Sequence, residues 1–465
     1  TMNEHLQQVL KENFGYDSFR GLQEEIIQTV LNHQDCLAIL PTGTGKSLCY
    51  QLPGVLLEGM VIIVSPLLSL MEDQVNGLLQ MKKFSAVAIN SLLTKSEREY
   101  VLTHLSEYQY IYLSPEMLSQ SECIQALSRQ KIALCVIDEA HCLSQWGVDF
   151  RPEYRNLKWV KKQLHDPTTL ALTASAPPKV KAEIQELLLH PDAQVFELPV
   201  NRPNIYLQVE KTNDKEAVLL KYLKELSGSG IIYCATRVQV EELYERLKKD
   251  YSIGYYHGGL SSNQRRLLQT QFQKNQLQLL VATNAFGMGI NKPDIRFVIH
   301  YDLPDNLESY VQEIGRAGRD GEPSIAILFY QNHDEQIHYY MQNQTRNERE
   351  VFELLDVPKN GAQKYFSELQ QKWFRQIQRE DYYLFMEEIK ANEKVKQAQL
   401  QTMLSYIHTN QCRRDFIAQY FENPLPDKQA LCCDNHGPFD YQLLVNSNIQ
   451  NEKIANWQEV LLKIF

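Results

Sequence analysis

The stretch Leu-Pro-Thr-Gly-Thr-Gly-Lys-Ser at residues 40–47 decides the fold class. It follows a short apolar run, residues 36–40, and precedes an apolar segment with helical spacing. A strand, a glycine-rich turn and a helix N-terminus in this order form a loop whose backbone N–H groups face phosphates. Lys46 adds a positive charge, and the Ser47 hydroxyl suits Mg²⁺. The stretch predicts a phosphate-binding site made by Thr42, Gly43, Thr44, Gly45, Lys46 and Ser47.

The stretch departs at one position from the strict pattern G-x-x-x-x-G-K-[ST]. The first glycine would fall at position 40, where the chain has Leu40. The simplest alternative is a glycine-rich turn from a strand to a helix that binds no ligand. That alternative does not explain why Lys46 and Ser47 follow the turn, so we favour phosphate binding.

A second run, Asp-Glu-Ala-His at residues 138–141, ends another apolar segment, residues 132–137. We expect Asp138 to hold the metal ion and Glu139 to orient or deprotonate the attacking water. Either run alone could arise by chance. Both runs in this order, each closing a buried strand, favour nucleotide hydrolysis.

The chain alternates short apolar strands with helical patterns twice. Predicted strands lie at residues 36–40, 61–65, 110–113, 132–137 and 169–172, and again at 229–234, 253–256, 277–283, 296–300 and 324–329. This alternation is typical of α/β proteins with parallel sheets covered on both faces. Two prolines in the stretch 198–204 predict a linker, and the strands stop near Asn332. We expect two lobes, 1–200 and 201–340, and then a mostly helical region, 341–465.

Composition and charge restrict the possible functions. The chain has 465 residues, 43% of them hydrophobic, and no apolar run long enough to cross a bilayer. Its start lacks the basic and apolar segments of a secretory signal, and its nine cysteines lie mostly in apolar segments, so we expect a reduced, cytoplasmic protein. The net charge of −10 excludes coating of nucleic acid by bulk charge. Any nucleic-acid site must be a local track whose affinity falls with salt.

Further motifs along the chain are FGYDSFRGLQ at 14–23, VSPLLSLM at 64–71, LSPE at 113–116, LTASA at 172–176, ATNAFGMGI at 282–290 and QEIGRAGRDG at 312–321. With these motifs, residues 6–436 resemble RecQ-type DNA helicases of helicase superfamily 2. The resemblance implies two RecA-like lobes that sandwich ATP and Mg²⁺. It also implies 3′-to-5′ movement on single-stranded DNA and unwinding of duplex DNA in repair or recombination. We expect a monomer that binds single-stranded and partly duplex DNA and no membrane.

The motif at residues 14–23 resembles the family's site for the nucleotide base. The Gln23 side chain offers a carbonyl and an amide, which match the donor and acceptor of an adenine edge. Tyr16 and Arg20 carry flat groups that can stack on the base. The alternative is the start of an amphipathic helix with Phe14 and Phe19 in the core, which leaves Arg20 and Gln23 unexplained.

The motif at residues 312–321 places two arginines three positions apart. The guanidinium groups of Arg316 and Arg319 match the geometry of a phosphoryl group. If the second lobe faces the first, these arginines reach the γ-phosphate, and the resemblance implies that Arg319 is the arginine finger and that Gln312 senses the same group. The alternative is a surface ion-pair patch with Asp320.

Aromatic residues are spaced by four in the run 142–154, at Trp146, Phe150 and Tyr154. A glycine and a proline within the run argue against a regular helix. Exposed aromatics beside Arg151 suit base stacking and phosphate contact, and the run resembles the family's aromatic-rich loop, which couples DNA binding to hydrolysis. The alternative is packing of these rings in the core.

Small or polar residues follow the ends of several predicted strands. Such groups contact phosphates without reading sequence, although each one alone is as well explained as a helix cap or turn residue. The motif context favours DNA contacts for Ser65, Ser69, Arg237, His257, Thr283 and Asn284.

The tail carries a set of metal-ligand residue types. Cys412 is followed by two arginines, as in the family's zinc module, but the usual C-x-x-C-x-x-C cluster is altered. Cys412, Cys432, Cys433 and His436 could form a tetrahedral zinc site. The alternative is a lost site with residual thiols. The helical sequence around residues 364–396 looks additional. Because the sequence ends soon after the cysteine cluster, we expect the family's winged-helix and C-terminal helical domains to be absent.

Rival functions follow from the same residues. A short chain suits a DNA-dependent translocase or annealing factor with weak unwinding, and an RNA helicase shares the same motifs. A nucleic-acid-binding scaffold with an inactive ATPase is a third alternative. The presence of Lys46, Asp138, Glu139 and Arg319 argues against it.

Overall fold

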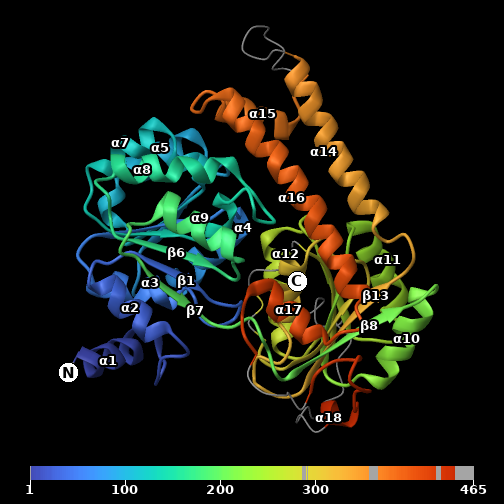
Figure 1. The fold of residues 1–465 in the computed structure, drawn as a ribbon. Helices are drawn as coiled ribbons and strands as arrows, with labels where there is room; N and C mark the ends of the chain where they lie inside the picture. The colour runs from blue at the N-terminus through green and yellow to red at the C-terminus, as the bar shows by residue number, and fades with distance from the viewer. Residues whose placement is uncertain (1, 285–289, 291, 356–364, 426–430, 446–465) are drawn as a thin grey trace. The chain divides into compact units, whose positions relative to one another are not determined.

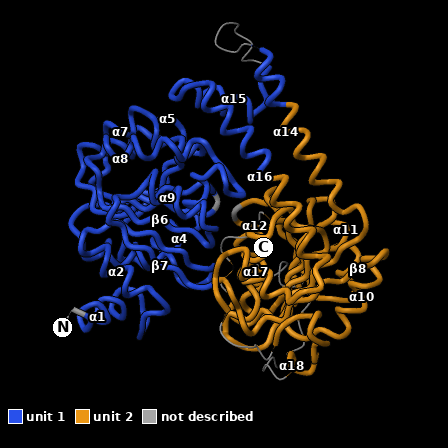
Figure 2. The backbone as a smooth tube through the Cα atoms, in the orientation of Figure 1, with its two compact units in different colours: residues 1–199, 348–395 blue, residues 200–347, 396–465 orange. Residues whose placement is uncertain are grey.

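The computed structural model describes residues 2–284, 290, 292–355, 365–425 and 431–445. The chain forms two compact units, and each unit is built from two separate segments (Figure 2). The first unit contains residues 1–199 and 348–395, and the second contains residues 200–347 and 396–465. The region 341–465, which we expected to stand apart, is therefore divided between both units.

The first unit is built on a seven-stranded parallel sheet with the order β3-β4-β2-β5-β6-β1-β7. Three of its strands, β6, β1 and β7, are labelled in Figure 1. Parallel strands present their carboxyl ends at one edge, where loops bind ligands. The loops after β1, β2, β5 and β6 therefore leave the sheet at the same edge. The strands are β1 (Cys36–Ile39), β2 (Met60–Val64), β3 (Ala86–Ile89), β4 (Tyr110–Leu113), β5 (Ile132–Ile137), β6 (Thr169–Thr173) and β7 (Gln194–Glu197).

Helices cover this sheet on both faces. Alternate residues of β1 enter different clusters: Leu37 and Ile39 join one core, and Cys36 and Ala38 join the other. Burial on both faces explains why the strands read as continuous apolar runs. The helices are α1 (Met2–Phe14), α2 (Gln23–Leu31), α3 (Leu48–Leu56), α4 (Leu68–Gln80), α5 (Lys95–Thr103), α6 (Pro115–Leu118), α7 (Ser121–Ser128), α8 (Leu157–Gln163) and α9 (Pro178–Leu188), with 3₁₀ turns η1 (Leu105–Glu107), η2 (Ala140–Leu143) and η3 (Pro152–Asn156).

The second unit repeats the architecture with a six-stranded parallel sheet of order β10-β11-β9-β12-β13-β8. Its strands are β8 (Ile205–Lys211), β9 (Ser229–Cys234), β10 (Ile253–Tyr256), β11 (Leu279–Thr283), β12 (Ile295–His300) and β13 (Ser324–Tyr330). Its helices include α10 (Lys215–Glu225), α11 (Arg237–Leu247), α12 (Ser262–Gln273), α13 (Leu307–Ile314), α17 (Arg413–Phe421) and α18 (Gln442–Val445). The two parallel sheets confirm the predicted fold class.

Residues 348–395 return to the first unit as a helical segment, which we name the insertion. It holds the end of α14 (Gln336–Leu354), all of α15 (Glu368–Gln376) and the first half of α16 (Tyr382–His408). Buried aromatic side chains, among them Phe352 and Trp373, form its core, and Phe150 of the first segment packs against them. The helices α14 and α16 therefore carry residues of both units.

Three strands have no counterpart among the predicted ones: β3, β7 and β8. The first two are edge strands, and the side chains of β7 are exposed or half-buried, so β7 does not read as an apolar run, whereas β3 is a short apolar run that was not predicted. The third, β8, begins directly after the predicted linker. Among the described residues, no helix is both long and apolar enough to span a membrane.

Candidate active site

The predicted phosphate loop leaves β1 and leads into α3. Gly43 and Gly45 have φ of 87° and 76°, a backbone conformation that glycine adopts without strain. A Cβ at Gly45 would lie 2.4 Å from the Gln23 amide nitrogen, so a side chain there would displace Gln23. Ser47 stands at the N-cap of α3 without using its side chain as a cap, which leaves its hydroxyl for another partner.

Gln23 braces this loop from α2. Its amide donates to the carbonyls of Thr44 at 3.1 Å and Gly45 at 3.0 Å, and its carbonyl accepts from the Arg20 backbone N–H at 2.8 Å. Tyr16 and the Arg20 side chain are exposed. The geometry therefore gives Gln23 a role in shaping the loop, while adenine recognition by Tyr16, Arg20 and Gln23 stays a prediction.

Asp138 and Glu139 follow β5 at the same edge of the sheet. The Asp138 backbone N–H donates to the Val64 carbonyl at 2.9 Å, and its Oδ1 accepts from the Glu139 N–H at 2.9 Å. Burial, followed by the Glu139 charge, raises the pKa of Asp138 to about 6, while the Lys46 charge lowers it. Lys46 thus acts electrostatically on Asp138, and the fold brings the two predicted runs together.

Glu139 belongs to a network that the motif alone did not reveal. It adopts φ of 50°, an uncommon backbone conformation for a residue other than glycine, and its side chain is buried. Its Oε2 lies 3.3 Å from His141 Nδ1, which also lies 2.9 Å from the Thr173 hydroxyl. Thr173 in turn donates to the Ser175 carbonyl at 3.1 Å. His141 and Thr173 therefore link the acidic run to the motif at 172–176.

The residues of this edge fit ATP with Mg²⁺. The Ser47 hydroxyl and the Asp138 carboxylate are oxygen ligands of the kind that Mg²⁺ takes, and Lys46 supplies the compact positive charge that a phosphate needs. A buried carboxylate with a raised pKa gains from a nearby cation, because the cation offsets the cost of its charge.

The second unit holds a cluster of arginines at the turn after α13, in which Arg316 is buried and Arg319 is half-buried. Arg319 donates through Nη1 to the Ile290 carbonyl at 2.7 Å, and among the described residues its Nε and Nη2 have no hydrogen-bond partner. Burial, then the charge of Arg316 and then that of Arg202, lowers the pKa of Arg319 to about 9. Burial of a charged guanidinium group is unfavourable unless an anion pairs with it, so this position favours binding of an anion such as a phosphate.

The alternative of a surface ion-pair patch is not what the structure shows. Arg316 is 1% exposed. Asp320 pairs instead with Arg296, at 2.5 Å between Oδ1 and Nη2. Gln312 lies half-buried on α13. Arg316 is therefore an interior group rather than a member of a solvated surface patch, and Arg319 is half-buried.

The run after the acidic motif forms a loop between η2 and η3, so the prediction that it is not a regular helix is confirmed. Its aromatic residues differ in environment. Trp146 is 37% exposed, with Lys179 Nζ 4.4 Å from its ring centroid, whereas Tyr154 is fully buried and Phe150 packs on the insertion. Core packing thus accounts for Phe150 and Tyr154, and base stacking stays a prediction that Trp146 can best serve.

Arg151 and the insertion hold this loop in place. Arg151 donates to Asp149 at 3.1 Å, and its backbone N–H donates to the Cys142 carbonyl. From the insertion, the Asn392 amide donates to the Gln145 carbonyl, and Glu388 pairs with Arg155 at 3.4 Å. The loop is thus positioned by a segment more than two hundred residues away in the sequence.

The residues predicted to contact DNA phosphates fall into different environments. Arg237 and Asn284 are exposed, and Thr283 ends β11 as a buried residue. Ser65 is buried, and among the described residues its hydroxyl has no hydrogen-bond partner. Ser69 lies in the first turn of α4, and its side chain is outside the described part, as are residues 285–289 of the motif at 282–290.

His257 is engaged within the chain on both sides of its ring. Its Nε2 lies 3.0 Å from Glu241, and its Nδ1 accepts from the Gly259 N–H at 3.0 Å. The ring is buried. The geometry therefore supports a structural role for His257 and gives its predicted phosphate contact no further support.

The four predicted zinc ligands meet in the second unit. One ligand atom from each of Cys412, Cys432, Cys433 and His436 lies within 4.8 Å of all the others. Cys412 caps α17, and its sulfur lies 3.4 Å from that of Cys432. Three thiols and an imidazole at this spacing match the donor set of a structural zinc site. Burial and the neighbouring thiols raise the pKa of Cys432 to about 12, which a bound cation would reverse.

Comparisons with known proteins agree with this geometry. Three family models match the chain: DEAD/DEAH box helicase over residues 20–184, helicase conserved C-terminal domain over 214–321, and RecQ zinc-binding over 369–437. The third match includes most of the segment 364–396 that looked additional in the sequence. The solved structure of the helicase MrfA bound to DNA shares the fold, with a TM-score of 0.59 and 19% identity over 71% of this chain and 51% of that one.

Curated relatives extend the match along the chain. The probable ATP-dependent DNA helicase RecS of Bacillus subtilis is 41% identical over 99% of this chain and 98% of its own length. The ATP-dependent DNA helicase RecQ of the same organism is 37% identical over 92% of this chain and 66% of its own length. On these motifs, this geometry and these relatives, the chain belongs to the RecQ family of ATP-dependent DNA helicases.

Proposed function

We propose that this chain hydrolyses ATP and uses the free energy to move 3′ to 5′ along single-stranded DNA and to unwind duplex DNA. The observation that carries the proposal is the meeting of Lys46, Asp138 and Glu139 at one edge of the first sheet, with Lys46 acting on the charge of Asp138. Membership of the RecQ family supports DNA as the nucleic acid. Action in repair or recombination, as a cytoplasmic monomer, belongs to the same proposal.

In the proposed mechanism the first unit binds and orients the triphosphate. The backbone N–H groups of residues 42–47 and the Lys46 ammonium hold the phosphates. Ser47 and Asp138 would hold Mg²⁺, which neutralises phosphate charge when bound. Glu139 accepts a proton from the attacking water. His141 fixes the Glu139 carboxylate through the contact at 3.3 Å, so the base is positioned before the nucleotide arrives.

The second unit supplies charge for the transition state. The Arg319 guanidinium has donors without partners among the described residues, and a phosphoryl group accepts such donors bidentately. An arginine supplied in this way accelerates phosphoryl transfer by about 10³- to 10⁵-fold. We therefore assign Arg319 as the finger and Arg316 and Gln312 as its neighbours at the γ-phosphate. Closing on ATP and opening after hydrolysis would move the protein along the strand.

The test combines hydrolysis with unwinding. ATP turnover is measured without nucleic acid, with single-stranded DNA and with RNA of the same sequence, and unwinding is measured on duplexes with a 3′ or a 5′ tail. We expect DNA to stimulate turnover more than RNA and only the 3′-tailed duplex to be unwound. Lys46→Ala should abolish turnover, whereas Lys158→Ala, at an exposed lysine of α8, should match the unaltered protein.

Each other result has a defined meaning. Stimulated turnover without unwinding of either duplex would favour a translocase or annealing factor. Stronger stimulation by RNA would favour an RNA helicase. Normal turnover in Lys46→Ala would refute the phosphate-loop assignment and, with it, the proposed function.

A further inference from the structure

Arg202 lies in the stretch that the sequence marks as a linker, yet its side chain is bound at several points. Its guanidinium donates to the backbone carbonyls of Gly315, Ala317 and Gly318, at 2.9, 3.1 and 2.8 Å. These carbonyls belong to the turn that carries Arg316 and Arg319. A guanidinium is a rigid, planar fork, so three bonds from one such group fix the turn in a single conformation.

Structural bracing alone does not explain a positive charge at this position. Burial lowers the pKa of Arg202, and the Arg202 charge itself disfavours the charged form of Arg319. Asp320, the nearby carboxylate that favours charged Arg202, is already bound to Arg296. A neutral donor would hold the same carbonyls without this repulsion, and Asn204 does so at Gly318, at 2.7 Å. The positive charge of Arg202 is explained if an anion binds to the cluster that it forms with Arg316 and Arg319.

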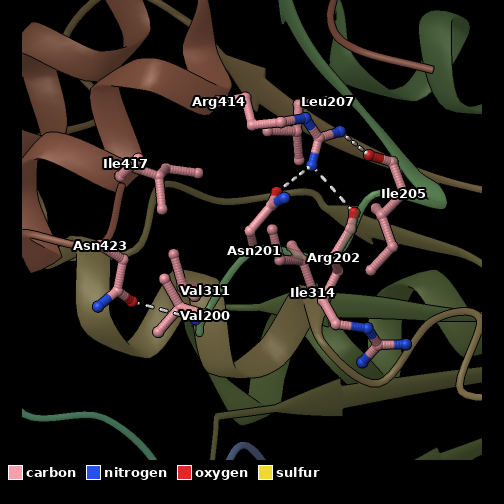
Figure 3. A pocket seen from close by; sticks show the side chains of 11 residues that line it. Val200, Asn201, Arg202, Ile205, Leu207, Val311, Ile314, Arg414, Ile417 and Asn423 are labelled. Atoms are coloured by element: carbon pink, nitrogen blue, oxygen red, sulfur yellow. Dashed lines mark hydrogen bonds between the residues drawn. The ribbon is translucent and has the colours of Figure 1, made fainter. Parts of the chain in front are cut away.

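Arg414 holds the backbone of Arg202 from the other side. It donates through Nη1 to the Arg202 carbonyl at 2.9 Å and to Asn201 Oδ1 at 2.8 Å. In Figure 3 the Arg202 carbonyl faces Arg414, while the Arg202 side chain runs the opposite way. Arg414 also donates to the carbonyl of Cys432, a zinc-ligand candidate, at 3.2 Å. A continuous set of hydrogen bonds therefore runs from the cysteine cluster to the finger turn.

The space between these groups is too small for a separate ligand. The cavity shown in Figure 3 has a volume of about 30 Å³, which is room for water only. Apolar side chains such as Val311, Ile314 and Ile417 line much of it. The arginines therefore act on the surrounding backbone rather than on a molecule bound in the cavity.

We propose that Arg202 is a positioning residue for ATP hydrolysis, which sets the turn so that Arg319 is aimed at the γ-phosphate, and that Arg414 extends this control to the cysteine cluster. The inference rests on the proposed function, because it assigns the finger to Arg319. It predicts that Arg202 acts on the rate of the chemical step and has no effect that is independent of Arg319.

A double-mutant cycle tests this prediction. Arg202→Lys keeps the charge but loses the three-point grip, and a finger misplaced by about 1 Å costs on the order of 100-fold in rate. We expect Arg202→Lys to lower kcat by about 10- to 100-fold, with the KM for ATP and the Kd for a fluorescent single-stranded DNA changed less than about twofold. In the Arg319→Ala background, Arg202→Lys should cause no further loss.

Arg414→Lys provides a second test. It should lower kcat less than Arg202→Lys does, and this loss should also disappear in the Arg319→Ala background. If Arg202→Lys protein does not fold, this second test stands alone. Asn423→Ala is the matched control, because Asn423 lines the same cavity and accepts a hydrogen bond from the Val200 N–H at 3.2 Å, and it should keep the unaltered kcat.

The inference would be overturned if the losses of kcat from Arg202→Lys and Arg319→Ala multiply in the double variant. It would also be overturned if Arg202→Lys lowers kcat, DNA affinity and melting temperature together, because Arg202 would then have a purely structural role. An unaltered kcat in Arg202→Lys would overturn it as well. A different result would refute the proposed function itself, namely that Lys46→Ala and Arg319→Ala both keep the ATP turnover of the unaltered protein.

Discussion

The side-chain amide of Asn392 donates a hydrogen bond to the backbone carbonyl of Gln145 at 2.8 Å, and so joins segments that are 247 positions apart in the chain. Gln145 directly precedes Trp146, and Asn392 is buried on α16. A single amide from the insertion thus fixes the backbone beside Trp146, the aromatic residue that we expect to stack on DNA bases.

Asn392→Ala should loosen this loop without unfolding the unit. The substitution leaves the Gln145 carbonyl without its donor, which costs about 1–3 kcal/mol of local stability. We expect amide hydrogen exchange of residues 144–151 to accelerate by about tenfold or more, with the core strands unchanged. Lys394→Ala, at an exposed position of the same helix, is the control. Equal exchange in both variants would contradict the anchoring role.

Asp138→Asn should abolish ATP hydrolysis and raise the stability of the fold. The folded pKa of Asp138 is about 6, above its ordinary value, so the folded protein holds this proton more tightly than the unfolded chain. Ionisation therefore destabilises the fold as the pH rises from about 4 to 6, by roughly 3 kcal/mol once complete. The variant should melt higher than the unaltered protein at pH 8, melt equally at pH 4, and lose hydrolysis. A lower melting temperature at pH 8 would contradict this explanation.

Glu308→Gln should show the same pH dependence at a site in the second unit. Burial raises the pKa of Glu308 to about 7, and Tyr420 donates to its Oε1 at 3.0 Å. Glutamine keeps an acceptor for Tyr420 and removes the buried charge. At pH 8 the free energy of unfolding of the variant should exceed that of the unaltered protein by roughly 3 kcal/mol, and at pH 4 the two should be equal. Thermal unfolding at both pH values measures this difference. A gain that is independent of pH would show that charge is not the cause.

The cysteine cluster should bind one zinc ion per chain. Metal analysis of protein purified without chelator checks the content, and Cys412→Ser should reduce it and lower the melting temperature of the second unit. Cys123→Ala, at a buried thiol outside the cluster, should keep its zinc. Protein that contains no zinc, takes none up and is equally stable after Cys412→Ser would favour residual thiols.

Much of the fold could be predicted because parallel strands buried on both faces read as apolar runs. β9 and β10 have the predicted bounds for that reason. The edge strand β7, with exposed side chains at Gln194 and Val195, carries no such signal. Nothing local could assign the insertion to the first unit, because its packing on Phe150 is decided by contacts far apart in the sequence.

The candidate site divides in the same way. Lys46 and Asp138 could be predicted because each belongs to a run in which spacing and order carry information. His141 lies within such a run, but only the fold shows that it reaches Thr173. Arg202 stands alone in a proline-containing stretch, and no sequence pattern reveals that its side chain binds a turn more than a hundred residues later.

The interleaved order of the two units has a consequence for dissecting the protein. A fragment ending at Pro199 would carry the whole first sheet and yet expose Phe150 and the apolar surface that the returning helices cover. Such a fragment should precipitate or require detergent, and a separately synthesised peptide of residues 348–395 should rescue its solubility. Complementation in trans, rather than simple truncation, is therefore the way to study either half in isolation.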